Sequence, residues 1–168
     1  GLHTWIAAKP RDATEYTVYE VIGWRKYRGL AVYVAHNRAP DGYWFGNRPW
    51  IVTELRGAAA EAALPRLQAA LDSYPYKDSY QMWPGPNSNT FTAHVGREVP
   101  ELALDLPPIA LGKDYLGLTT VFASSPSGTG YQVSLFGALG VLAARKEGLE
   151  LNFLGFIFGI DPIAPALK

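Results

Sequence analysis

The sequence predicts an α+β fold in which an antiparallel sheet packs against a few helices. The first third of the chain is strand-like, a segment after it has helical composition, and the final third is again rich in β-branched and aromatic residues. The chain has 168 residues, of which 48% are hydrophobic, and this is enough for one sizeable core. We therefore expect residues 1–168 to form a single domain.

Three strand-like segments open the chain. They are "LHTWIAAK" (2–9), "EYTVYEVIGW" (15–24) and "LAVYVAHN" (30–37), separated by turn or charged residues. The simplest arrangement for them is a three-stranded antiparallel meander. Residues 38–50 follow, and their Pro, Gly and aromatic residues predict an ordered loop packed by its own rings.

The segment 57–75 has helical composition, with Leu64, Leu67 and Leu71 at spacings of three and four. A proline in a helix interior costs about 3 kcal/mol, whereas the first turn tolerates it. Pro65 therefore predicts a short first helix and a second helix that begins near it.

The stretch "GPNSNTF" (85–91) begins with a turn, and the spacing of Phe91 and Val95 predicts a helix after it. Ser88 is then expected at the amino-terminal end of this helix. Asn87 and Ser88 are both good capping residues, so an ordinary cap explains their types without any catalysis.

The final third is expected to be largely β, from "TTVFASS", "GYQVSLFGALGVLAA" and "LELNFLGFIFG". Gly137 and Gly140 leave the middle piece open between helix and strand. The most apolar run, residues 151–160, is well short of the roughly 20 residues that a spanning helix needs, which predicts a soluble domain. The chain opens on Gly1 rather than Met, so we expect an upstream segment that held a signal or an anchor.

The composition of the chain excludes several kinds of functional site. Fifteen basic and fifteen acidic residues give a formal charge of zero, which gives no indication of a nucleic-acid partner. The absence of cysteine excludes disulfides, thiolate metal sites and a cysteine nucleophile. The three histidines are scattered and show no ligand spacing, so we expect no metal and no cofactor.

A serine at a helix start needs a general base to become a nucleophile. The helix dipole contributes about 1 kcal/mol, too little to ionise a hydroxyl at neutral pH, so a histidine must take the proton. His94 lies six residues beyond Ser88 on the same predicted helix, roughly 9 Å along its axis, which is too far. His3 and His36 remain as candidates.

The residues "LHTWIA" on the first strand and "NSNTF" at the helix start resemble the PPPDE peptidases, a permuted branch of the papain-like superfamily. The resemblance implies a permuted papain-like arrangement in which His3 corresponds to the base and Ser88 replaces the nucleophilic cysteine. Asn87, Asn89 and Trp83 are then expected to support the site. A structural histidine at position 3, local backbone bonding by Asn89 and a core position for Trp83 are the alternatives.

A third polar residue to orient His3 stays open. By residue type, Glu20, Asn37 and Asp114 are the candidates.

The chain also resembles an uncharacterised bacterial family that usually carries an N-terminal membrane segment. The residues that carry this resemblance are "HTWIA", "WFGN", "WPGPNSNTF" and "GKDYLG". It implies a place at the bacterial cell envelope, either membrane-anchored or periplasmic, and brings no established activity.

These resemblances lead to several functional hypotheses. The first is an amide or ester hydrolase with a Ser88–His3 dyad. The second is a pseudoenzyme, a binding or assembly module of the envelope whose aromatic loop (43–50) and apolar segment (151–160) contact an unidentified protein partner. A lipid acyl-transfer or phospholipase-like activity is a third. The serine itself has three explanations: adaptation to serine chemistry, loss of catalysis, or an experimenter's substitution.

Overall fold

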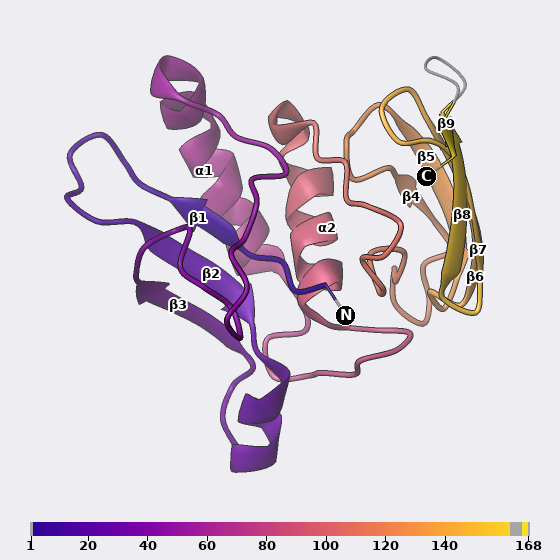
Figure 1. Cartoon of the computed structure of the whole chain (residues 1–168), viewed down its shortest axis with the longest axis horizontal. Helices are drawn as coiled ribbons and strands as arrows, with labels where there is room; N and C mark the ends of the chain where they lie inside the picture. The colour runs from indigo at the N-terminus through magenta and orange to yellow at the C-terminus, as the bar shows by residue number, and fades with distance from the viewer. Residues whose placement is uncertain (1, 162–165, 168) are drawn as a thin grey trace.

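The computed structural model describes residues 2–161, 166 and 167, and it contains two antiparallel sheets and two α-helices (Figure 1). The predicted α+β class is confirmed. In Figure 1 the three-stranded sheet lies on the left, the six-stranded sheet on the right, and helix α2 between them. The elements are β1 (Ile6–Ala8), β2 (Thr17–Val21), β3 (Tyr33–Asn37), α1 (Gly57–Ser73), α2 (Ser88–Glu98), β4 (Phe122–Ser124), β5 (Gly130–Leu135), β6 (Leu139–Ala144), β7 (Gly148–Phe153), β8 (Phe156–Asp161) and β9 (Ala166–Leu167), with 3₁₀ helices η1 (Gly23–Arg28) and η2 (Pro100–Leu102).

The first sheet has the predicted meander order β1-β2-β3. Tyr19 pairs with Ile6 on one side and with Ala35 on the other. The second strand ends earlier than expected, because the chain turns into η1 at Gly23 and leaves it through Gly29 at a φ of 66°. That left-handed conformation is easy for glycine and costly for a side chain with a Cβ.

Helix α1 is continuous through Pro65, so the prediction of two helices divided there is wrong. Pro65 removes one backbone hydrogen bond, but it lies on the exposed side of the helix, where water can satisfy the freed carbonyl of Glu61. The opposite side, with Ala63, Ala70 and Leu71, is buried and holds the helix against the core.

Helix α2 lies between the two sheets and contacts both of them. Phe91 and Val95 are fully buried in a core shared with the first sheet and α1. On the other side, Arg97 donates to the backbone oxygen of Ser124 and to the side chain of Gln132 in the six-stranded sheet. Gly96 allows this close approach, because a Cβ there would lie 2.7 Å from the Pro126 oxygen.

The second sheet has the order β4-β5-β6-β7-β8-β9, and all neighbours are antiparallel. The predicted β character of the final third is confirmed. The piece that the sequence left open forms the β5–β6 hairpin, and its turn contains Phe136 and Gly137, both with positive φ. In the described part of the chain no helix is long and apolar enough to cross a membrane.

Candidate functional site

The first turn of α2 is held by a capping box. The side chain of Asn87 accepts hydrogen bonds from the backbone N–H groups of Asn89 and Thr90, and Thr90 accepts one from the backbone of Asn87. The Phe91 N–H donates to the Asn87 backbone oxygen. Ser88, as predicted, is the first helical residue, and its own N–H is the one in this turn that Asn87 does not bind.

Two asparagines fasten this turn to distant segments. Asn87 donates from Nδ2 to the backbone oxygens of Met82 and Leu111, at 2.8 and 2.9 Å. Asn89 donates to the oxygens of Leu111 and Leu2, at 2.9 and 3.2 Å. Of the predicted supporting residues, Asn87 therefore joins the turn to the segments at Met82 and Leu111, and Asn89 joins it to the start of the chain at Leu2.

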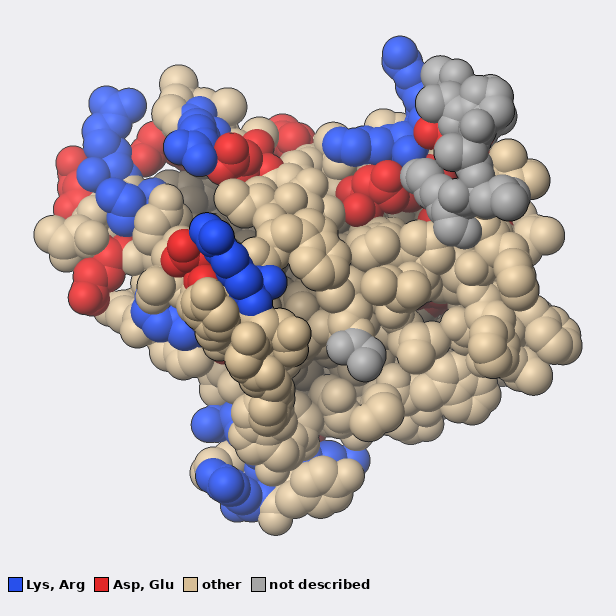
Figure 2. Space-filling model, viewed as in Figure 1, with Lys and Arg blue, Asp and Glu red and all other residues tan. Residues whose placement is uncertain are grey.

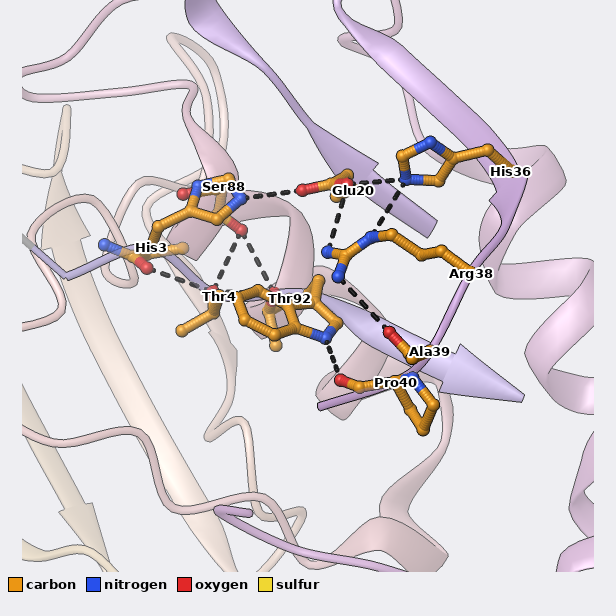
Figure 3. A network of polar contacts seen from close by, with 11 residues as sticks. His3, Thr4, Glu20, His36, Arg38, Ala39, Pro40, Ser88 and Thr92 are labelled. Carbon is orange, nitrogen blue, oxygen red and sulfur yellow. Dashed lines mark hydrogen bonds and ion pairs between the residues drawn. The ribbon is translucent and has the colours of Figure 1, made fainter. Parts of the chain in front are cut away.

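Thr4 brings the start of the chain against Ser88. Its hydroxyl oxygen lies 3.3 Å from the backbone oxygen of Ser88, 3.0 Å from Oδ1 of Asn89 and 2.8 Å from the Thr92 hydroxyl. His3, the preceding residue, is drawn with Ser88 at one end of this polar network in Figure 3. The segments that carry the two predicted catalytic residues are therefore adjacent.

His3 is held by a carboxylate and by an indole. Its Nε2 lies 2.9 Å from Oε2 of Glu20, and its ring stacks on Trp44 with centroids 3.8 Å apart and planes 5° apart. An ionised carboxylate only accepts hydrogen bonds, so Nε2 of His3 is the protonated nitrogen. In the neutral ring Nδ1 is then unprotonated and able to accept a proton.

Glu20 is 1% exposed and has three cationic or potentially cationic partners. His36 reaches Oε1 at 2.6 Å, and Arg38 reaches the same oxygen at 3.3 Å. Burial alone raises the pKa of Glu20, but the hydrogen bond from His3, the charge of Arg38 and the hydrogen bond from His36 together outweigh it. The net pKa therefore lies below its ordinary value. Glu20 is thus a buried carboxylate that stays charged.

The other two candidates for orienting His3 have different partners. Asn37 accepts a hydrogen bond from Thr17 in the neighbouring strand. Asp114 accepts one from Asn152 in β7, at 2.8 Å. Of the three residues left open by the sequence, Glu20 is the one in contact with His3.

His94 is a packing residue between the two helices. Its Nε2 lies 3.0 Å from the Ala70 oxygen of α1, and burial lowers its pKa. The Nε2 atom and the ring of His94 both face α1, which agrees with the prediction that His94 is not the base for Ser88. Among the residues that the structure describes, no group of three His, Asp or Glu side chains is arranged to hold a metal ion.

Trp83 lies on the turn that leads to Ser88 and is 43% exposed, so the interpretation of Trp83 as a core residue is wrong. Its ring packs against Gly155 in the β7–β8 turn, where a Cβ would lie 2.7 Å from the indole nitrogen. The predicted support of the site by Trp83 stays a prediction.

The site is covered. Ser88 is 5% exposed and the side chain of His3 is 13% exposed. The loop that carries Trp44 lies over the imidazole, with a bridge between Trp44 and Asn47 closing it. The Trp44 loop therefore shields His3, and Ser88 has little exposed surface.

Three contacts of the site were not predicted from the sequence, and two of them had a partial signal there. Thr4 follows His3 directly in the quoted "LHTWIA". Trp44 belongs to the quoted "WFGN", whose ring packing was predicted without its partner. Arg38 and His36 reach Glu20 because Val18 pairs with His36, which puts Glu20 and His36 on the same face of the sheet at a diagonal position.

Residues 1–115 match the model of the family described as "Protein of unknown function (DUF3750)". The matched part contains His3, Glu20 and Ser88 and ends at Tyr115, before the six-stranded sheet begins at Phe122. No match was found among curated proteins. None was found among solved structures.

Proposed function

We propose that this chain, which belongs to the DUF3750 family, is a hydrolase of an amide or ester in which Ser88, His3 and Glu20 act together. The observation that supports it best is the 2.9 Å hydrogen bond between Nε2 of His3 and buried Glu20, with Thr4, the residue after His3, in contact with the backbone oxygen of Ser88. A nucleophile, a base and a carboxylate that orients the base form the arrangement that activates serine on unrelated folds. The resemblance to the permuted papain-like branch supports the same pairing.

In the proposed reaction the Ser88 hydroxyl oxygen bonds to the substrate carbonyl carbon while Nδ1 of His3 takes its proton. The N–H of Ser88 donates to the oxyanion, because Asn87 leaves that group free. The carbon–nitrogen or carbon–oxygen bond then breaks, and His3 returns the proton to the leaving amine or alcohol. Water then bonds to the acyl carbon while His3 takes its proton, the carbon–oxygen bond to Ser88 breaks, and His3 returns the proton to the Ser88 oxygen as the acid leaves. Glu20 keeps the imidazole oriented and stabilises its charged form.

An alkyl fluorophosphonate reporter tests the nucleophile. We expect it to label the wild-type protein at Ser88 and to label neither Ser88→Ala nor His3→Ala, while Glu20→Gln labels much more slowly. Ser79→Ala, which changes an exposed serine, is the matched control and is expected to label like the wild type. Intact-mass spectrometry reads the adduct.

The Ser88→Cys variant tests the base separately from the reagent. Because the chain has no cysteine, the introduced side chain is its one thiol. We expect its alkylation by iodoacetamide to follow a pKa below about 8.5, the value of a free thiol. Addition of His3→Ala is expected to return that pKa toward the free value. An ordinary pKa in Ser88→Cys, together with no fluorophosphonate adduct on the wild type, would reject the proposal.

A non-catalytic binding or assembly module is the second candidate, and the covered site favours it. Ser88 has little exposed surface, whereas Tyr43, Phe45 and Trp50 in the aromatic loop are 70%, 78% and 60% exposed. Such rings are typical of contact surfaces. A Ser88→Ala protein that keeps its full biological role, while a Phe45→Ala protein loses it, would favour this candidate. Its location at the cell envelope is a proposal that rests on the resemblance alone and is tested by fractionation of cells.

A further inference from the structure

The six-stranded sheet has an apolar outer face. Strand pairing places apolar residues in register across it, as in the row Phe122, Val133, Val141, Leu151 and Phe158. Every large apolar side chain of this face is between 41% and 69% exposed. The members are Phe122, Tyr131, Val133, Leu135, Leu139, Val141, Leu149, Leu151, Phe153, Phe156, Phe158 and Ile160.

The inner face of the same sheet, which is turned toward α2, is largely polar. Gln132 binds Arg97, Glu150 binds Lys113 at 2.6 Å, and Asn152 binds Asp114 at 2.8 Å. These sheet residues are at most 8% exposed. A sheet with one face in water ordinarily has the opposite polarity, apolar inside and polar outside. The alternation in β5–β8 therefore fits a sheet whose outer face is also covered.

The size of this face exceeds what monomers usually expose. Half-exposed side chains of this number leave on the order of 1,000 Å² of apolar surface, given about 150–250 Å² for each aromatic side chain. The largest apolar patch of a typical monomer is about 300–600 Å². The outward positions of β5–β8 carry no Lys, Arg, Asp or Glu, and in Figure 2 the right-hand part of the molecule below its upper margin is almost entirely uncharged.

We propose that this outer face is the interface of a homodimer, in which two copies pack sheet against sheet. A stable interface buries roughly 800 Å² per partner, and obligate homodimers bury more and are more apolar, which matches the face in area and in character. A two-fold axis near the centre places the same apolar rows against each other and needs no complementary charge. Packed sheets lie about 10 Å apart with strands within about 30° of each other.

A second copy fits the face better than a lipid surface does. The outward positions of β5–β8 carry no Lys or Arg that would draw the sheet to anionic headgroups, and the chain has no net charge. Face-to-face packing also leaves the charged β6–β7 turn, with Arg145 and Lys146, at the rim of the interface. The homodimer does not depend on the proposed hydrolase activity.

Sedimentation equilibrium of the whole chain tests the proposal. We expect the wild type to sediment at twice 18.4 kDa. Leu151→Glu, at the centre of the face, is expected to weaken dimerisation by about 30-fold or more, the effect of losing a hot spot. Tyr27→Glu is the matched control, since Tyr27 is 90% exposed in η1 and is expected to leave the dimer unchanged. Circular dichroism checks that both variants fold.

Spin labels attached to single introduced cysteines give a second readout of dimerisation, one that a folding defect would not imitate. Leu151→Cys is expected to place two labels close enough for dipolar broadening and to hide them from a water-soluble relaxant, whereas Tyr27→Cys shows neither effect. A wild-type protein that sediments as a monomer would overturn the proposal. So would a dimer that Leu151→Glu leaves intact, or a monomer that binds phosphatidylcholine vesicles through this face.

Discussion

At the residue scale, Glu20 organises the candidate site. It joins His3, His36 and Arg38 through one buried carboxylate, and each of those side chains comes from the first sheet or from the segments beside it. The carboxylate is more stable charged than neutral because its partners outweigh the effect of burial. Glu20 therefore links the stability of the sheet to the orientation of His3.

Replacement of Glu20 by Gln should lower the free energy of unfolding at pH 7 by about 3 kcal/mol, because the charges of its partners lose their counter-charge. The pKa of Glu20 is lower in the folded state than in the unfolded state. Its stabilisation is therefore present above about pH 4.3 and is lost as the pH falls through the folded-state pKa. Urea unfolding between pH 3 and 7 should be less pH-dependent in Glu20→Gln. The exposed Glu15→Gln is the control, and equal pH slopes in both variants would contradict the assignment.

At the element scale, the start of α2 combines a cap with a tether. Asn87 supplies both, since Oδ1 caps the helix and Nδ2 binds the segments at Met82 and Leu111. Gly112 makes room for this amide and has a φ of 90°, which a side chain with a Cβ rarely adopts. The "GKDYLG" segment thus packs against the capping residue of α2.

The variant Asn87→Ala should lose about 2 kcal/mol of stability, the upper end for an N-cap, because buried amide partners are also left unsatisfied. Chemical denaturation measures the loss. Asn47→Ala, at an exposed loop position, should change stability by less than about 0.5 kcal/mol. Equal effects of the two substitutions would show that Asn87 does not fasten the helix start.

At the scale of the whole molecule, a buried ion pair connects the six-stranded sheet to the rest. Lys113 and Glu150 are 1% and 2% exposed, and their charged atoms lie 2.6 Å apart. Burial raises the pKa of Glu150, and Lys113 offsets that rise only in part. The pair lies between the apolar outer face and α2, so it is part of the polar layer that gives this sheet its inverted polarity.

Lys113→Met should cost about 3–5 kcal/mol at pH 7, because it leaves Glu150 buried without a counter-charge. The double variant Lys113→Met/Glu150→Leu should recover most of that loss, since an apolar pair of similar size is often neutral. The folded-state pKa of Glu150 is raised, so the penalty of the single variant should shrink as the pH falls and Glu150 takes up a proton. Denaturation at a fixed protein concentration measures the stability of the single and of the double variant. A double variant as unstable as the single one would contradict this account.

The sequence by itself determined the features that depend on near neighbours. Alternation of residues predicted the β1-β2-β3 meander and the β character of the final third, and the capping residues at Asn87 predicted the start of α2 at Ser88. The lack of cysteine excluded thiol chemistry outright. These succeed because strand alternation and helix caps are set within a few residues.

Only the tertiary structure decided which distant residues meet. By residue type, Glu20, Asn37 and Asp114 were equally good candidates for orienting His3. Long-range packing decided between them, because it brings Glu20 into hydrogen-bond contact with His3. The same packing carried α1 through Pro65, because burial of Leu71 and its neighbours outweighs one lost hydrogen bond on the exposed side. The sequence also did not predict that the inner face of the six-stranded sheet is polar. Alternation shows that a strand has two different faces, but it does not show which of them α2 covers.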